Sequence, residues 1–184
     1  HENVFRNLYL NQWTEQAVRA IPMQAWDKLC TEKLTEEDLR GEPCYVGMDL
    51  ASTRDVAALV AVFPREDGKF ALLPYLFAPE DSIDARAGHD RAKLMGFLKS
   101  GLITPTPGNE TAFPMVAACF KELCEKFDVR ALAYDPWNAA ATVQNIVEEG
   151  FPIDNVFKFP QTISNFAEPT GLFISLVKLG KLIH

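Results

Sequence analysis

The sequence predicts one α/β domain built on a mixed sheet: an antiparallel three-strand meander followed by parallel strands, flanked by helices. Three apolar runs come first, at 44–50, 56–63 and 70–77, and their connections are too short to hold a helix. Helical and strand-like segments then alternate to the end of the chain. A chain of 184 residues is long enough for one ordinary domain with a hydrophobic core.

Residues 1–40 are expected to form a helical and irregular lead-in segment packed on the domain, and residues 41–184 the domain itself. The first strand is bounded by Gly41-Glu42-Pro43, and Pro64-Arg65-Glu66-Asp67-Gly68 predicts a hairpin between the second and third runs. An acidic loop is expected around Glu80, Asp81 and Asp84. The later segments are expected to be a helix at 90–99 capped by Asp90, a strand at 103–106, a helix at 113–127, a strand at 129–134, a helix capped by Asn138 and ending at Glu149, a strand at 155–159 and a helix at 166–179.

Composition narrows the functional class only slightly. The chain is 48% hydrophobic and 23% charged, as globular proteins usually are, and it has no apolar run long enough for a membrane span and no signal-peptide pattern at its start. A net charge of −7 argues against a generally nucleic-acid-binding surface, although a local basic strip remains compatible with it. The four cysteines lack a zinc-binding spacing and are expected to be reduced thiols in the core.

The segment Gly47 to Asp55, Gly-Met-Asp-Leu-Ala-Ser-Thr-Arg-Asp, carries the strongest functional signal. It places Asp49 in an otherwise apolar strand, where we expect the side chain to be buried. Burying a carboxylate is costly unless it is paired, hydrogen-bonded or bound to a metal. Asp49 is therefore either a structural hydrogen-bonded residue or part of a chemical site.

Asp135 stands in a matching position, late in the apolar run 129–134 and directly before Pro136. If the two strands are parallel neighbours, both carboxylates emerge at the same edge of the sheet. Two close carboxylates need a proton or a cation between them. Oxygen ligands favour Mg²⁺ or Mn²⁺. Two such ions about 3.5–4 Å apart can catalyse the cleavage of a phosphodiester. The alternative for Asp135 is an ordinary turn residue before proline.

Further candidates surround these two carboxylates. Ser52, Thr53 and Arg54 are predicted either to contact phosphate or simply to form the turn. Asp55 is a possible secondary acid, or it pairs with Arg54. After the second strand end, Asn138 is a possible DNA contact, and Trp137 either stacks on a base or sugar or is buried under the edge of the site. Lys158 is one of several cations that either contact phosphate or are merely solvated.

The stretch from Tyr45 to Asp55, followed by Ala57-Ala58-Leu59, closely resembles the first strand and hairpin of the nuclease domain of tailed-bacteriophage terminase large subunits. Ala133-Tyr134-Asp135-Pro136-Trp137-Asn138 resembles the second acidic strand end of that family. Weaker likeness at residues 3–13, 99–109 and 180–184 extends the resemblance over nearly the whole chain.

The resemblance implies a ribonuclease H-like fold and divalent-metal cleavage of double-stranded concatemeric DNA during genome packaging. Asp49 and Asp135 would be the first two ligands of Mg²⁺ or Mn²⁺. The implied partners are double-stranded DNA and, in a full-length parent, an ATPase domain, a small terminase subunit and the portal, in the cytoplasm of the infected bacterial host. The family's third acidic ligand is expected beyond a segment like 180–184, and no phosphate-binding P-loop occurs in the chain, so we expect a C-terminally incomplete nuclease domain with weak or no activity.

Two other functions remain open at this level. One is a nucleotide-binding domain of the actin and sugar-kinase class, because residues 49–53 resemble its phosphate-binding hairpin. That hairpin usually has glycine where Ala51 stands, and no second glycine-rich loop is present in the sequence. The other is a catalytically silent ribonuclease H-like docking module.

Overall fold

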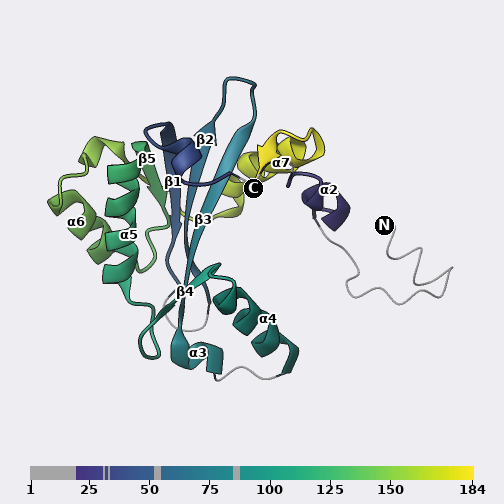
Figure 1. Ribbon diagram of the computed structural model, residues 1–184. Coiled ribbons are helices and arrows are strands. Elements are labelled where there is room, and N and C mark those ends of the chain that lie inside the picture. Colours follow the sequence, from purple (N-terminus) through teal and green to yellow (C-terminus); the bar gives the residue numbers. More distant parts are fainter. Residues whose placement is uncertain (1–19, 31, 33, 52–54, 85–87) are drawn as a thin grey trace.

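The structure of the protein is a computed structural model that describes every residue except 1–19, 31, 33, 52–54 and 85–87. The described residues form a mixed sheet with the strand order β4-β3-β2-β1-β5-β6, and β7 pairs with the start of β3 (Figure 1). The strands are β1 (Pro43–Asp49), β2 (Ala57–Pro64), β3 (Phe70–Pro79), β4 (Ile103–Thr106), β5 (Asp128–Tyr134), β6 (Val156–Lys158) and β7 (Leu182–Ile183).

The pairing confirms the predicted mixture of antiparallel and parallel strands. β1, β2 and β3 form the antiparallel meander, in which Gly47 pairs with Val60. β5 lies parallel to β1, β6 lies parallel to β5, and β4 lies parallel to the end of β3. The hairpin between β2 and β3 closes where the Gly68 N–H donates to the Arg65 carbonyl over 3.0 Å, and Gly68 has the positive φ of 73° that this turn requires.

Helices cover the two faces of the sheet unequally. In Figure 1, α5 and α6 lie together on one side of the sheet, while α7 and α2 lie on the other and α4 lies near β4. The helices are α2 (Met23–Asp27), α3 (Glu80–Asp84), α4 (Gly88–Lys99), α5 (Phe113–Lys126), α6 (Ala140–Glu148) and α7 (Ile163–Lys178), with short 3-10 helices η1 (Glu37–Leu39) and η2 (Ile153–Asn155).

The main hydrophobic core lies between the sheet and the pair α5 and α6. Alternate residues of β1 and β2, such as Val46 and Leu59, are buried there against Phe120. Phe120 also meets Phe151 edge to face, with ring centroids 5.0 Å apart. A second core cluster joins α3 and α4 to β4, and a third joins α7 to β7 and to the start of β3.

Most predicted segments are present within a few residues of the expected bounds, but three local expectations are wrong. The acidic loop expected at 80–84 is the short helix α3, which begins where the Ser82 hydroxyl donates to the Pro79 carbonyl over 2.9 Å. Asp90 is not the cap of α4, because that helix already begins at Gly88. Asn138 is not the cap of α6, because Ala139 occupies that position and Asn138 has a left-handed φ of 59°.

The described part of the lead-in packs on α7 and on the end of the chain. Leu29 is buried in one cluster with Val177 and Leu182. Nearby, the Trp26 indole stacks on the His184 ring, with centroids 4.2 Å apart. The boundary between residues 1–40 and 41–184 stays a prediction.

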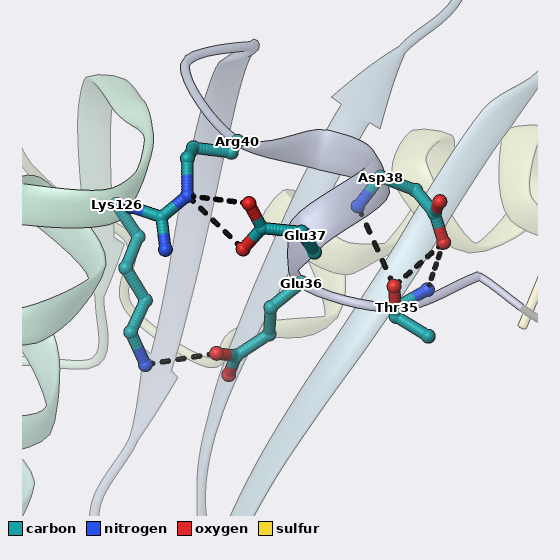
Figure 2. A network of polar contacts seen from close by, with 6 residues as sticks. All are labelled: Thr35, Glu36, Glu37, Asp38, Arg40 and Lys126. Atoms are coloured by element: carbon teal, nitrogen blue, oxygen red, sulfur yellow. Dashed lines mark hydrogen bonds and ion pairs between the residues drawn. The ribbon is translucent and has the colours of Figure 1, made fainter.

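Glu36 joins the lead-in to the sheet and to α5. Its carboxylate accepts a hydrogen bond from the Lys126 ammonium over 2.8 Å (Figure 2) and another from the Tyr75 hydroxyl over 2.9 Å. The bond from Lys126 lowers the pKa of the Glu36 carboxyl, and Glu36 in turn raises the pKa of Lys126. Burial, together with the bond to Glu36, raises the pKa of Tyr75.

Local contacts close the same stretch of the lead-in (Figure 2). The Thr35 hydroxyl and amide both donate to the Asp38 carboxylate, over 2.6 and 2.9 Å, and lower the pKa of that carboxyl. The Arg40 guanidinium contacts Glu37 over 3.1 Å, and both side chains are largely exposed. Glu36 is thus the acidic residue of this stretch that reaches other elements of the fold.

Candidate active site

The structure brings Asp49 and Asp135 to the same edge of the sheet. β1 and β5 are parallel neighbours, as the site hypothesis requires, and Met48 pairs with Tyr134 one residue before each carboxylate. Asp49 ends β1 and Asp135 directly follows β5. Both side chains line one cavity of about 250 Å³ at this edge.

Asp49 is exposed, which corrects the expectation of a buried carboxylate. Burial along β1 alternates: Val46 and Met48 face the core under α5 and α6, while Tyr45, Gly47 and Asp49 point away from it. Tyr45, at the other end of this row, is 50% exposed. An apolar run around Asp49 predicts a buried strand, but the outer face of β1 carries Tyr45 and Gly47, and these residue types occur on covered and uncovered faces alike.

Small side chains form the part of the cavity nearest the carboxylates. Gly47, Ala58 and Ala133 lie on the three adjacent strands β1, β2 and β5, and a Cβ added to Gly47 would meet no atom within 4 Å. No long side chain from these three positions therefore covers the sheet surface beside the two carboxylates, so a bulky substrate can approach it.

Aromatic side chains beyond β5 form another part of the cavity wall, and sequence reasoning had missed them. Phe159 and Phe166 pack edge to face with ring centroids 5.3 Å apart, and Gln161 lies between them in the chain and also lines the cavity. The Phe159 amide donates to the Tyr134 carbonyl over 2.7 Å, which attaches this segment to the end of β5. The sequence did offer one signal for these residues. The strand predicted at 155–159 corresponds to β6, which lies parallel to β5 and so brings Phe159 to the same edge of the sheet.

The charges of Asp49 and Asp135 are left without a counter-ion by the described residues. No described lysine, arginine or histidine forms an ion pair with either carboxylate. Two carboxylates on one cavity favour a cation between them, and oxygen ligands suit Mg²⁺ or Mn²⁺. The donor set thus fits a divalent metal, although among the described residues no three or more acidic, histidine or cysteine side chains are placed to hold a metal ion together.

The turn after β5 holds Asp135 in place. Its Oδ1 accepts a hydrogen bond from the Trp137 amide over 3.0 Å, and Pro136 restricts the backbone between them. The turn continues through Asn138 in the left-handed region, and α6 begins at Ala140. Asp135 is therefore a turn residue, as one of the two expectations for it stated. Its other carboxylate oxygen, Oδ2, can still bind a metal.

The remaining predicted site residues are less informative. Ser52, Thr53 and Arg54 lie outside the described residues. Asp55 and Asn138 are exposed on the two loops that follow β1 and β5. Neither residue lines the cavity that holds Asp49 and Asp135.

The cysteines stand apart from this cavity. Burial raises the pKa of Cys44 to about 12 and the pKa values of Cys119 and Cys124 to about 11, so these thiols stay protonated at neutral pH. Cys30 is exposed and lies 3.5 Å from Nδ1 of His184. None of the four takes part in the candidate site.

Comparisons with known proteins point to one group. The family model described as "Terminase large subunit, endonuclease domain" matches residues 2–184. The large terminase subunit of Enterobacteria phage HK97 is 32% identical over 183 residues, which cover 100% of this chain and 35% of that protein. Protein YmfN of Escherichia coli K12 is 24% identical over 190 residues, covering 99% of this chain and 41% of that protein. The chain thus spans well under half the length of these curated relatives.

Solved structures give the same grouping. The crystal structure of the HK97 bacteriophage large terminase matches with a TM-score of 0.77 and 26% identity, over 100% of this chain and 37% of that one. The large terminase nuclease from thermophilic phage G20c matches with a TM-score of 0.53 and 12% identity, over 87% of this chain and 72% of that one, which is a likeness of fold. Among the described residues, no helix has the length and apolar character to cross a membrane.

Proposed function

Because this chain belongs to the family of terminase large subunit endonuclease domains, we propose that it is a metal-dependent DNA endonuclease with Asp49 and Asp135 as its first metal ligands. The observation that carries this proposal is the convergence of two carboxylates, which the described residues leave without an ion pair, on one cavity at the ends of parallel strands. The fold and the family both favour a nuclease over the nucleotide-binding alternative.

The proposed substrate is double-stranded DNA, cut from concatemers for packaging by the motor to which such a subunit belongs. The ATPase domain, small terminase subunit and portal are proposed partners of the whole protein, and the host cytoplasm is its proposed location. These statements concern a longer polypeptide, because the chain covers only 35% of one curated relative and 41% of the other.

In the proposed mechanism, Asp49 and Asp135 would hold a pair of Mg²⁺ or Mn²⁺ ions. Bound there, the ions would lower the pKa of a water molecule and stabilise the leaving oxygen of the phosphodiester. Asp135 is oriented by the Trp137 amide, so its free oxygen keeps one direction. The low surface made by Gly47 and Ala133 admits the DNA backbone.

The decisive experiment replaces Asp49 by asparagine, which keeps the shape and removes the charge. Asp49→Asn should abolish Mn²⁺-dependent nicking of supercoiled plasmid by the full-length parent, and Mn²⁺ titration followed by electron paramagnetic resonance should show weaker binding. Glu66→Gln, in the exposed β2–β3 hairpin at the opposite end of the sheet, is the matched control. Wild-type nicking that survives in Asp49→Asn would overturn the assignment, and wild-type protein that binds no Mn²⁺ would favour the silent docking module.

A further inference from the structure

Trp137 is exposed directly beside the candidate metal site. Its side chain is 76% exposed, whereas tryptophan is on average among the more buried residues. It follows Asp135 by two residues, and its own amide donates to that carboxylate. Of the two outcomes expected for this residue, burial under the edge of the site is therefore wrong, and the exposed ring needs another explanation.

The backbone of the turn restricts the position from which the Trp137 side chain projects. Pro136 on one side restricts the chain, and Asn138 on the other adopts the left-handed φ of 59°, which non-glycine residues take at a cost. The hydrogen bond from the Trp137 amide to Asp135 spans 3.0 Å. The indole is therefore attached to a turn whose position is tied to a proposed metal ligand.

A cation lies near the same turn, in a pocket beside α6 that is separate from the cavity of Asp49 and Asp135. Lys158, at the end of β6, pairs with Tyr134 and lines a pocket of about 500 Å³ together with Pro136. The side chain is exposed, and the described residues give it no ion pair. In a chain of net charge −7, a lysine near this turn that the described residues leave without an ion pair offers a contact for a phosphate.

We propose that Trp137 is a base-stacking subsite, on which a nucleobase that leaves the duplex stack next to the scissile phosphate packs, while Lys158 contacts a phosphate of the same strand. An exposed indole is suited to this because every base has a π face, and stacking tolerates any sequence. The subsite rests on the proposed nuclease function. It would position the strand relative to Asp135 without reading its sequence.

Stacking is tested directly with a short single-stranded oligonucleotide that contains 2-aminopurine, whose fluorescence falls when it stacks. The titration is done with the whole chain in buffer without divalent metal, so that no cleavage occurs. Wild-type protein should quench the probe, whereas Trp137→Ala should quench it little and bind about tenfold more weakly. Trp137→Phe keeps a ring and should restore most of both signals.

Two further variants separate stacking from general effects. Leu179→Ala removes another exposed apolar side chain, 70% exposed and at the far end of α7, and should leave the binding unchanged. Lys158→Gln should weaken binding for every sequence and reduce the dependence of log affinity on log salt by about one contact. In cleavage assays, Trp137→Ala should raise KM more than it lowers kcat.

The outcomes distinguish this subsite from the proposed function. Equal quenching and affinity in wild type and Trp137→Ala, or no quenching by wild type, would overturn the subsite, even if Asp49→Asn abolishes nicking. Quenching that depends on Trp137, together with a full-length parent that cuts no DNA with Mn²⁺, would uphold the subsite and contradict the nuclease assignment. Thermal unfolding of each variant checks that the fold is kept.

Discussion

Two kinds of carboxylate occur in this domain. Glu36 is surrounded by hydrogen-bond donors of other side chains, whereas the described residues place no such side-chain donor on Asp49 or Asp135. Glu36 receives hydrogen bonds from Lys126 and Tyr75, and its pKa falls as a result. Asp49 and Asp135 share a cavity without an ion pair from any described residue. The carboxylate of Glu36 is neutralised within the fold, whereas the two carboxylates that we propose as metal ligands have no ion-pair partner among the described residues.

This difference also separates their effects on stability. Replacing Glu36 should remove charge-assisted hydrogen bonds that join three parts of the chain. Neutralising Asp49 or Asp135 should relieve repulsion between like charges and cost the fold little. Activity and stability should therefore respond to different carboxylates, and the following tests are arranged from the largest expected effect to the smallest.

In the full-length parent, Asp135→Asn should reduce Mn²⁺-dependent plasmid nicking by about 100-fold or more, because a neutral amide is a poor ligand for a hard cation. The amide oxygen still accepts the bond from the Trp137 amide, so thermal unfolding should hardly change. Asp135→Ala loses that bond as well and should cost about 1 kcal/mol of stability in addition. Equal stability of the two variants would show that the turn does not depend on this bond.

Glu36→Gln should have the reverse profile, with a loss of about 1–2 kcal/mol in the free energy of unfolding and no change in nicking. The loss arises because Lys126 and Tyr75 keep only a neutral partner. Urea unfolding measures the loss. Glu37→Gln is the matched control, since its contact with Arg40 is exposed on both sides and should be worth less than about 0.5 kcal/mol.

The pH dependence of stability should change with Glu36. Its folded pKa is lowered by Lys126, so its contribution is present above its ordinary value of 4.5 and is lost as the pH falls through the folded value. The raised pKa of Lys126 acts at the other end: its contribution is present below 10.5 and is lost as the pH rises through the folded value. Glu36→Gln should flatten both slopes in urea unfolding measured across pH, and unchanged slopes would contradict the pairing.

Gly47→Ala should have the smallest effect, a gain of about 0.5 kcal/mol in the free energy of unfolding. Glycine weakens a strand interior, and the added Cβ would meet no atom within 4 Å. Guanidinium unfolding measures the change. A loss of stability would mean that the outer face of β1 is covered more tightly than the exposed Asp49 and Tyr45 indicate.

Much of this fold was predictable from local patterns. The three apolar runs and the hairpin signal at 64–68 led to β1, β2 and β3, and the later alternation led to most of the helices and strands. The predicted helix caps were wrong. Asp and Asn are common N-caps, but α4 begins before Asp90 and α6 begins later than a cap at Asn138 would place it. Helix ends depend on neighbouring backbone bonds, which a short sequence window does not contain.

By itself, the sequence determined that Asp49 and Asp135 end similar strands behind small residues, because side chains alternate along any strand. Only the tertiary structure decided that these strands are parallel neighbours and that the outer face near Asp49 is exposed. The same holds for Trp137, whose sequence position allowed either a buried or an exposed ring. Alternation fixes which residues share a face, but what covers that face depends on how α5, α6 and α7 pack from distant parts of the chain.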